Sequence, residues 1–389
     1  MKRICKIMIV AGEASGDAHA AKLVRALRAE SPDTDFEFFG ATGAKMREAG
    51  VETVLNADNL AIVGLAEIGR ALAMFWRAFQ LLKREAVKRK PDAVILVDFP
   101  DFNLKLAKSL HKQNLKIVYY ISPQLWAWRK YRARTIKRYV DLLLAILPFE
   151  KEWYERRGIS HVEYVGNPLA KEVFSSLTKE QFCAEHKLDA AKPILALLPG
   201  SRQKEIARIF PPLLETVALM AEKNPDLQFV TALASSKKVL TIEQMVETAK
   251  QKDLKLPKVL LTVAEQTREV LNASDAAAVT SGTATLETAI IGTPMAIVYK
   301  TSALNYGLLR PLITVEHFGL INLIAGERLA KEFIQTDFTP DALAAEIFRL
   351  LGTETNKKMR ERLMEVSDML GKGGASKRAA QAILKLLED

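Results

Sequence analysis

The sequence has little cysteine and lacks the short motifs typical of metal, redox and nucleoside triphosphate sites. Among its 389 residues only Cys5 and Cys183 are cysteines, and neither lies in CxxC or Cys/His ligand spacing, so we expect no disulfide framework and no metal site. A GxGxxG dinucleotide fingerprint and a GxxxxGK(S/T) phosphate loop are both absent. The chain is therefore expected to need no redox or other cofactor.

Long uncharged apolar runs are missing as well. No stretch is long enough to cross a bilayer, so any membrane contact is expected to be peripheral. The apolar run that begins at Ile7 follows Lys6 and reaches Glu13 too soon for a secretory signal, and we expect the chain to stay in the cytoplasm. The 56 basic and 46 acidic side chains give a formal charge of +10, which favours anionic partners such as nucleotides, nucleic acid or acidic lipids.

Apolar segments that do not alternate with polar residues recur along the chain, each followed by a turn and a helix-prone stretch. Ile7–Ala11 leads into the loop Gly12–Asp17, and Ile194–Leu198 leads into Pro199–Arg202. Strands of this kind are buried on both faces of a parallel sheet. The two copies predict an α/β fold of two Rossmann-like domains that face each other across a cleft.

The chain is long enough for two such domains of ordinary size. We expect an N-terminal domain at 1–168, a C-terminal domain at 169–365 and a helical segment at 366–389. Within that last segment, Ser376–Leu387 has the spacing of an amphipathic helix. We expect this helix to pack back towards the N-terminal domain.

The loop after Ile194–Leu198 has the features of an anion site. In an open α/β sheet a strand, a tight turn and a helix leave backbone N–H groups free at the carboxyl edge, where phosphates bind. Gly200 and Ser201 form the turn, Arg202 adds a planar fork of donors, and Glu205 follows in the next helix. We interpret this loop as the binding site for a diphosphate. The alternative is an ordinary connection with a solvated arginine.

A second loop of small residues follows the strand predicted at Asp275–Val279. These residues are Ser281, Gly282 and Thr283. They let a phosphate approach the backbone, and Glu287, one turn into the helix, has the reach to accept from ribose hydroxyls. Asn322, which we place on a later loop, is expected to reach the same ligand. The alternative for the small residues is close packing of a helix on the sheet.

The strand predicted at Ala93–Val97 runs directly into Asp-Phe-Pro-Asp-Phe-Asn. A carboxylate at the carboxyl end of a strand is placed to take a proton from a bound hydroxyl, so Asp98 is a candidate general base. A structural or capping role is the alternative. We expect Asp101 to cap the helix that starts near Phe102, because its oxygen can accept from the first unpaired N–H groups.

Two stretches of the first half combine aromatic and basic residues. Ser122–Arg129 follows a predicted strand and precedes a basic helix, but no RRM, KH or helix-turn-helix pattern surrounds it. We expect no nucleic acid there; a phosphate-bearing small ligand and a solvated helix fit equally well. Leu60–Lys90 has apolar residues at helical spacing and a basic flank, as in a helix that lies in a bilayer interface. By pattern alone a core-facing helix is favoured.

Seven segments, taken in order, resemble the lipid-A-disaccharide synthase family over nearly the whole chain. They are Ala-Gly-Glu-Ala-Ser-Gly-Asp (11–17), Asp-Phe-Pro-Asp-Phe-Asn (98–103), Ser-Pro-Gln-Leu-Trp-Ala-Trp-Arg (122–129), Leu-Pro-Phe-Glu (147–150), Leu-Leu-Pro-Gly-Ser-Arg (197–202), Ser-Gly-Thr-Ala-Thr-Leu-Glu (281–287) and Asn-Leu-Ile-Ala-Gly (322–326). The ordered set is far more specific than any one member. The resemblance implies a metal-independent, anomer-inverting glycosyltransferase of the GT-B type. Such an enzyme joins a UDP-2,3-diacylglucosamine donor to 2,3-diacylglucosamine 1-phosphate (lipid X) through a β(1→6) bond and releases UDP, in lipid A biosynthesis.

The resemblance also implies roles for particular residues. Asp98 falls on the family's acidic residue needed for activity, and Glu13, Arg202 and Asn322 match positions tied to function there. Substrate contacts are expected from further residues in or beside the matching segments. These are Ser15, Gly16, Asp17, Asn103, Ser122, Trp126, Arg129, Gly200, Ser201, Glu205, Ser281, Gly282, Thr283 and Glu287.

Both implied substrates carry acyl chains, which shifts the interpretation of Leu60–Lys90 towards membrane contact. We then expect Leu72, Phe75, Trp76 and Phe79 to meet the anionic surface of the inner membrane. The implied enzyme is cytoplasmic and bound peripherally to that surface. The resemblance leaves a homodimer open.

Two other functions stay open on the sequence. One is another GT-B enzyme acting on UDP-N-acetylglucosamine, such as a 2-epimerase with a soluble substrate; the membrane-type helix and the Trp-Ala-Trp-Arg stretch argue against it. The other is a non-catalytic nucleotide-binding module, in which Asp98 and Glu13 at strand ends would have no purpose.

Overall fold

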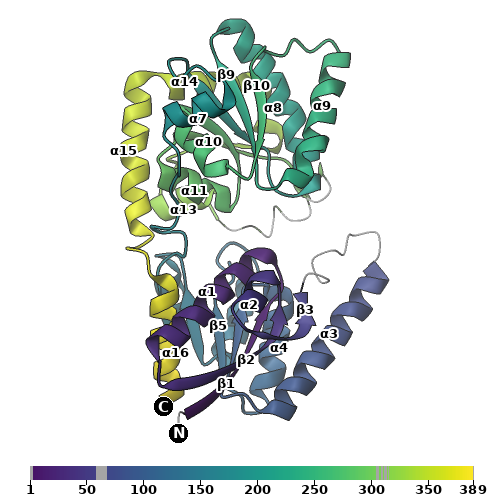
Figure 1. Cartoon of the computed structure of the whole chain (residues 1–389), viewed down its shortest axis with the longest axis vertical. Coiled ribbons are helices and arrows are strands. Elements are labelled where there is room, and N and C mark those ends of the chain that lie inside the picture. Colours follow the sequence, from purple (N-terminus) through teal and green to yellow (C-terminus); the bar gives the residue numbers. More distant parts are fainter. Residues whose placement is uncertain are drawn as a thin grey trace. The chain divides into compact units, whose positions relative to one another are not determined.

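The computed structural model describes residues 3–57, 68–303, 306–307, 310, 313 and 315–388, without the side chains of 68–72. The chain divides into two units (Figure 1). The first contains residues 1–168 and 372–389, and the second contains residues 169–371. Each unit is built on one parallel sheet with helices on both faces, which confirms the predicted pair of Rossmann-like domains.

The first unit has a seven-stranded sheet in the order β3-β2-β1-β4-β5-β6-β7. Its strands are β1 (Arg3–Ala11), β2 (Thr34–Thr42), β3 (Glu52–Asn56), β4 (Ala93–Val97), β5 (Ile117–Tyr120), β6 (Leu142–Ala145) and β7 (Val162–Tyr164). Its helices are α1 (Ala14–Glu30), α2 (Ala44–Glu48), α3 (Ile68–Arg89), α4 (Pro100–His111), the 3-10 helix η3 (Lys130–Arg132), α5 (Ala133–Tyr139), α6 (Glu150–Glu155) and α16 (Ala375–Glu388). The strand order reverses between β1 and β4, whose ends are aligned with Ala11 opposite Val97. The loops that follow these two strands therefore lie side by side at the carboxyl edge of the sheet.

Strand β4 shows why these apolar runs become central strands. All five of its residues are buried, and successive side chains face opposite sides of the sheet. Val94 and Leu96 pack in the core formed with α3 and α4. Ile95 and Val97 pack in the core formed with α1 and α16. A strand covered on both faces has no solvent side, so it needs no polar alternation.

Helix α16 belongs to the first unit although it lies at the other end of the chain. Ala379, Ala380 and Ile383 are buried against α1. Arg378 Nε donates to the carbonyl of Val165 at 2.8 Å, and Lys116 Nζ donates to a carbonyl in the last turn of α16 at 2.8 Å. This packing confirms that the C-terminal helix returns to the N-terminal domain.

The second unit has a six-stranded sheet in the order β10-β9-β8-β11-β12-β13. Its strands are β8 (Ile194–Leu198), β9 (Gln228–Leu233), β10 (Leu260–Ala264), β11 (Ala276–Thr280), β12 (Met295–Tyr299) and β13 (Glu332–Ile334). Its helices are α7 (Lys179–His186), α8 (Gln203–Lys223), the 3-10 helix η4 (Ser236–Lys238), α9 (Val239–Gln251), α10 (Thr267–Ala273), α11 (Thr283–Ile291), α13 (Leu320–Ala325), the 3-10 helix η6 (Gln335–Asp337), α14 (Pro340–Leu351) and α15 (Thr353–Met369). Helix α15 runs through the boundary expected at 365.

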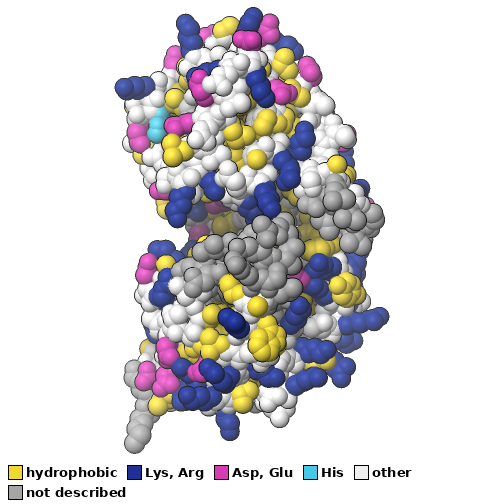
Figure 2. Space-filling model, turned by 90° about the vertical axis from the view of Figure 1, so that its right-hand side faces the viewer, with side chains coloured by type: hydrophobic (Ala, Val, Ile, Leu, Met, Phe, Trp, Pro, Cys, Tyr) yellow, Lys and Arg dark blue, Asp and Glu magenta, His cyan; other side chains and the backbone are white. Residues whose placement is uncertain are grey.

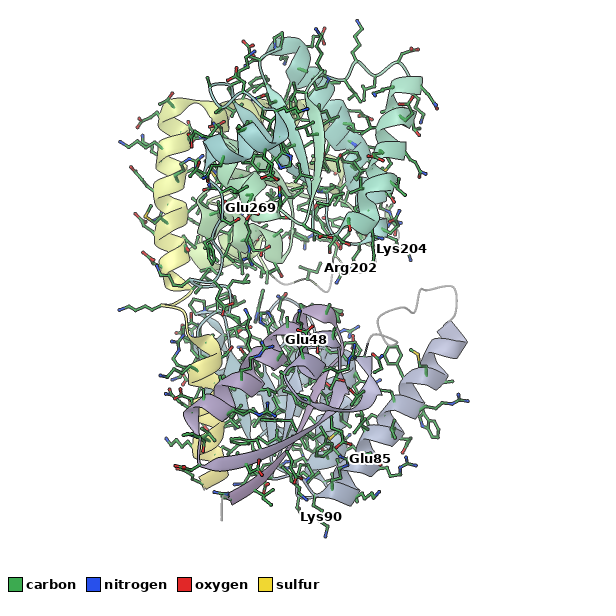
Figure 3. The ribbon with its side chains drawn as sticks, viewed as in Figure 1. Glu48, Glu85, Lys90, Arg202, Lys204 and Glu269 are labelled. Carbon is green, nitrogen blue, oxygen red and sulfur yellow. The ribbon has the colours of Figure 1, made fainter. Side chains whose placement is uncertain are left out.

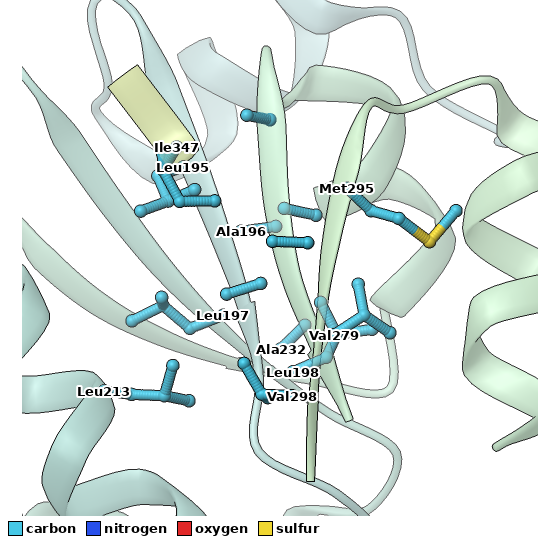
Figure 4. Close-up of a cluster of buried hydrophobic side chains, with 14 of the residues drawn as sticks. Leu195, Ala196, Leu197, Leu198, Leu213, Ala232, Val279, Met295, Val298 and Ile347 are labelled. Carbon is cyan, nitrogen blue, oxygen red and sulfur yellow. The ribbon is translucent and has the colours of Figure 1, made fainter. Parts of the chain in front are cut away.

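The core of the second unit surrounds β8 (Figure 4). Leu195 and Leu197 of this strand are fully buried, as are Leu213 of α8, Val298 of β12 and Ile347 of α14. The strand order reverses between β8 and β11, where Leu198 lies opposite Val279. The loops after β8 and β11 are thus neighbours, as the loops after β1 and β4 are in the first unit.

Candidate active site

The turn after β4 holds the candidate base in an unusual backbone conformation. Asp98 and Phe99 are consecutive non-glycine residues in the left-handed region, with φ of 48° and 51°. The Asp98 N–H donates to the carbonyl of Tyr120 at 3.0 Å, and the Asp98 carbonyl accepts from the Tyr119 hydroxyl at 2.7 Å and from Asn103 Nδ2 at 2.8 Å. Such conformations cost about 1–3 kcal/mol each and cluster at functional sites, where surrounding contacts enforce them.

The carboxyl group of Asp98 is electrostatically coupled to Glu13. Burial raises the pKa of Asp98, the negative charge of Glu13 raises it further, and a hydrogen bond from the Phe99 backbone opposes the shift. Glu13 is the exposed N-cap residue of α1, but its side chain caps no N–H of the helix. The structure therefore brings together the two acidic residues predicted at the ends of β1 and β4.

A close backbone contact fixes the two loops against each other. A Cβ atom added at Gly12 would lie 2.3 Å from the Phe99 ring, so any larger residue would force the ring to move. The Phe99 ring also packs against Phe102, with a centroid distance of 5.6 Å. In the first turn of α1, Ser15 is exposed and Gly16 is buried. Ser15 is thus open to a ligand, whereas the contact predicted for Gly16 would have to be made through its buried backbone.

Two residues predicted to contact substrate hold the backbone instead. The buried carboxylate of Asp17 accepts hydrogen bonds from the N–H groups of Gly43, Lys45 and Met46, at 2.8, 2.8 and 3.1 Å, and so caps the start of α2. Asn103 is fully buried, and its Nδ2 donates to the carbonyls at the end of β4. The structure thus gives both side chains partners within the protein, and their contact with substrate stays a prediction.

The loop after β5 is also turned inward. Ser122 and Trp126 are buried, and Trp126 Nε1 donates to Glu150 Oε1 at 3.0 Å, so both lie among protein groups rather than at an open surface. Their contact with substrate stays a prediction. The sequence gives no sign of the role of Glu150, because its burial depends on how the loops fold together.

Asp101 does not cap α4, in contrast to the sequence prediction. The helix begins at Pro100, and its N-cap residue is Phe99. Asp101 Oδ1 instead accepts from Arg129 and Arg132 at 2.7 and 2.5 Å. Burial acts to raise the pKa of Asp101, but the two guanidinium groups outweigh it and the pKa is lowered. Arg129 is therefore engaged in an ion pair beside the candidate base.

The loop after β8 places its arginine outward and its glutamate inward. The Arg202 side chain is 74% exposed, and its Nη1 lies 3.1 Å from Glu205 Oε1. Arg202 and Lys204 both lie at this edge of the second unit (Figure 3). Glu205 Oε2 accepts from the N–H groups of Ser201 and Arg202 at 3.3 and 3.2 Å. Gly200 has φ 107°, and a Cβ atom added there would lie 2.8 Å from the same carboxylate. The N–H groups expected to be free are thus occupied by Glu205.

The loop after β11 is bonded to a neighbouring segment. The Ser281 hydroxyl donates to the carbonyl of Phe318 at 2.8 Å, whereas Thr283 is exposed. Gly282 is the N-cap residue of α11. Glu287 lies 3.5 Å from Arg268, so this carboxylate has a basic partner within the unit.

Asn322 lies in helix α13 and not on a loop, which corrects its predicted place. It is fully buried; its Nδ2 donates to the carbonyl of Ala330 at 2.7 Å and to Glu332 at 2.9 Å, and its Oδ1 accepts from the Ala330 N–H. Glu332 in turn accepts from the N–H groups of Phe318 and Gly319. Asn322 therefore supports the segment to which the β11 loop is bonded.

Helix α3 buries part of the surface predicted to face a membrane. Phe75 packs against Phe99 and Phe102, and Phe79 packs against Phe102. Both rings are half-buried, and their contact with lipid stays a prediction. Trp76 is 64% exposed, whereas Leu72 lies outside the described side chains. Figure 2 shows lysine and arginine side chains, with hydrophobic ones between them, on the side of the first unit that carries α3.

None of the helices in the described part of the chain is long and apolar enough to cross a membrane.

Two Rossmann-like units with polar loops at the switch points of their sheets define the GT-B architecture, which glycosyltransferases and related epimerases share. Solved structures agree on the fold. A putative UDP-N-acetylglucosamine 2-epimerase from Listeria monocytogenes has a TM-score of 0.65 at 16% identity, covering 98% of this chain and 96% of its own. A glycosyltransferase from Rickettsia africae has a TM-score of 0.60 at 14% identity, covering 100% of both chains.

Sequence comparison narrows this class to one family. The family model described as lipid-A-disaccharide synthetase matches residues 7–386. The lipid-A-disaccharide synthase of Trichlorobacter lovleyi is 43% identical over 385 residues, which cover 99% of this chain and 98% of the relative. That of Geobacter sulfurreducens is 42% identical over 384 residues, covering 98% and 97%. The chain belongs to the lipid-A-disaccharide synthase family, whose enzymes act in lipid A biosynthesis on lipid-linked sugar donors and acceptors.

Proposed function

We propose that this chain joins UDP-2,3-diacylglucosamine to 2,3-diacylglucosamine 1-phosphate through a β(1→6) bond and releases UDP, with inversion and without a metal. The observation that carries the proposal is the Asp98 turn. A carboxyl group with a raised pKa, held by strained backbone at the switch point of a parallel sheet and beside a second acidic residue, suits a general base.

The proposed reaction is one in-line displacement. The Asp98 carboxylate takes the proton from the 6-hydroxyl of the acceptor as that oxygen forms a bond to the anomeric carbon of the donor. The bond from the anomeric carbon to the phosphate oxygen breaks, and its electron pair leaves with UDP. Glu13, exposed beside Asp98, would orient the acceptor or share the proton.

Arg202 is proposed to stabilise the charge that develops on the leaving diphosphate. Its guanidinium is exposed and paired with Glu205, so it can turn to a ligand without loss of core packing. A planar fork of donors suits a diphosphate better than a point charge. The exposed hydroxyls of Ser15 and Thr283 and the carboxylate of Glu287 remain proposed substrate contacts.

We also propose that the enzyme binds peripherally to the cytoplasmic face of the inner membrane, where its acylated substrates are held. Trp76 and the basic side chains of α3 support this, since a ring at headgroup depth and cations beside anionic lipid favour interfacial binding. A homodimer remains a proposal of the same kind.

Measurement of UDP release with and without the acylated acceptor tests the proposed function. We expect release from UDP-diacylglucosamine only when the acceptor is present. Release that ignores the acceptor, or conversion of UDP-N-acetylglucosamine to an epimer, would favour the rival functions.

Replacement of the candidate base gives a second test. Asp98→Ala should lower kcat by about 10²–10⁴-fold, the usual contribution of positioned proton transfer. Turnover near the wild-type rate would remove Asp98 from this role.

A further inference from the structure

Glu150 is a fully buried carboxylate at the start of α6. Its Oε1 accepts a hydrogen bond from Trp126 Nε1 at 3.0 Å, and its Oε2 accepts from the N–H groups of Ile146 and Leu147 at 3.1 and 3.0 Å. The donors come from two segments, the loop after β5 and the end of β6. A buried charge is costly unless such donors surround it, so Glu150 joins these segments.

A neighbouring residue of α6 binds the same loop. The buried hydroxyl of Tyr154 accepts from Ser122 Oγ at 2.9 Å and donates to the carbonyl of Pro123 at 3.1 Å. Burial raises the pKa of Glu150 to about 7, although the hydrogen bond from Trp126 and those from the backbone lower it. The ionised form of Glu150 is thus stabilised by the hydrogen bonds from Trp126 and the backbone.

The loop held by Glu150 leads to the turn that carries the candidate base. Arg129, at the end of this loop, pairs with Asp101 in the first turn of α4, two residues after Phe99. Tyr119, in β5 just ahead of the loop, donates its hydroxyl to the carbonyl of Asp98 at 2.7 Å. Contacts thus connect the loop to the Asp98 turn from both of its ends.

We propose that Glu150 is a positioning residue for sugar transfer: by holding Trp126 it fixes the loop 121–129, and through that loop it fixes the Asp98 carboxylate. The inference rests on the proposed glycosyltransferase function. Glu150 acts through Trp126 and touches no substrate.

Four variants of the full-length chain test this role. Glu150→Gln keeps the shape but offers one oxygen and one N–H₂ group to three donors, so it loses either the bond from Trp126 or those from the backbone. Trp126→Phe removes the bond from Trp126 alone. The third is the double variant. Glu152→Gln is the matched control, because Glu152 lies on the same helix but is exposed and paired with Arg156.

We expect each single substitution to lower kcat by up to about 10²-fold, the cost of roughly 1 Å of misplacement. The KM for the UDP-sugar should stay near the wild-type value, since the second unit is proposed to hold the diphosphate. The double variant should lose less than the product of the two single losses, because both substitutions act on the same cluster of hydrogen bonds. Glu152→Gln should match the wild type.

A spectroscopic measurement reports on the loop without catalysis. In protein labelled with 5-fluorotryptophan, the ¹⁹F resonance that disappears in Trp126→Phe belongs to Trp126. This resonance should shift in Glu150→Gln and stay in place in Glu152→Gln.

Each outcome bears on the proposal. A folded Glu150→Gln variant with wild-type kcat and an unmoved Trp126 resonance overturns it, as does a double variant whose losses multiply. If Glu150→Gln does not fold, Trp126→Phe decides, and full kcat there overturns the proposal. If the wild type releases no UDP, the proposed function fails; an unmoved resonance would then overturn the positioning role as well.

Discussion

The protonation of Asp98 should set the acid side of the activity profile. A general base works only when ionised, so the rate should fall as the pH drops below its pKa. Burial raises that pKa first and the charge of Glu13 raises it further. Glu13→Gln removes the second effect and should move the acid limb of kcat/KM to lower pH.

The pH profile of kcat/KM for both proteins measures this shift. Glu48→Gln serves as a control, because Glu48 is an exposed carboxylate of the same unit that pairs with Lys45. A limb that stays in place in Glu13→Gln, or moves to higher pH, contradicts the coupling.

Replacing the Arg202 guanidinium should lower kcat strongly even when the positive charge is kept. Arg202→Lys should lower kcat by roughly 10²–10³-fold, the usual effect of removing one preorganised donor, because an ammonium cannot bind the diphosphate at two points. Lys204 lies at the same edge of the unit (Figure 3). Lys204→Gln tests whether any nearby cation suffices; an equal loss in both variants would argue against a specific role for Arg202.

At the scale of single residues, the sequence predicted positions better than contacts. Asp98 and Glu13 could be placed at strand ends, because the apolar runs before them are plain in the sequence. The carboxylate partners of Ser122, Trp126 and Asn322 could not be predicted, since Glu150 and Glu332 approach these residues only in the folded chain. The sequence therefore predicts ligand contacts for the polar residues of the matching segments, although several of these side chains form hydrogen bonds between loops.

The contact between the β1 loop and the β4 turn should be sensitive to one methyl group. Gly12→Ala would place a Cβ atom 2.3 Å from the Phe99 ring, so the ring must move, and the Asp98 turn with it. Overpacking of this kind typically costs about 1–3 kcal/mol. We expect lower stability and lower kcat, with partial recovery when Phe99→Ala is added.

Urea unfolding followed by tryptophan fluorescence measures the change in stability of the unit that carries the Gly12→Ala substitution. All four tryptophans, at 76, 126, 128 and 153, lie in the first unit. The signal therefore follows that unit alone, which avoids assuming that the whole chain unfolds in one step. A Gly12→Ala variant with wild-type stability and kcat would show that the contact is unimportant.

At the scale of elements, buried apolar runs predict several strands, but β12, which is apolar and largely buried, is not among those predicted. Strands β4 and β8 match their predictions because each is buried on both faces. Strand β1 begins at Arg3 rather than at the predicted Ile7, because its first residues are mostly exposed and partly charged. The edge strands β3 and β7 were not predicted, since β7 has only three residues and β3 carries polar side chains. Their strand conformation depends on a neighbour in the sheet, which the sequence does not display.

The protein as a whole carries an excess of positive charge, and α3 exposes an aromatic ring among basic residues. We predict that the chain floats with vesicles of anionic phospholipid, and that Trp76→Ser weakens this binding. Leu240→Ser is the matched control, because Leu240 is 71% exposed on the second unit. Binding should also fall at high salt. No flotation of the wild type, or equal loss in both variants, would contradict the proposal.

The division into two α/β units was predictable, because a repeated strand, loop and helix pattern reports directly on fold class. The return of the C-terminal helix could be expected from its amphipathic spacing. Its partners could not, since Val165 and Lys116 lie more than two hundred positions away in the chain.

Because α16 follows the second unit in the chain, the first unit is completed only after the second has been synthesised. Residues 1–168 emerge with the apolar face of α1 uncovered, and the 203 residues of the second unit must follow before α16 can shield it. At about 5–20 residues per second this interval is roughly 10 to 40 s. During that time the apolar face of α1 is exposed on the nascent chain. We expect chaperones at the exit tunnel to bind it.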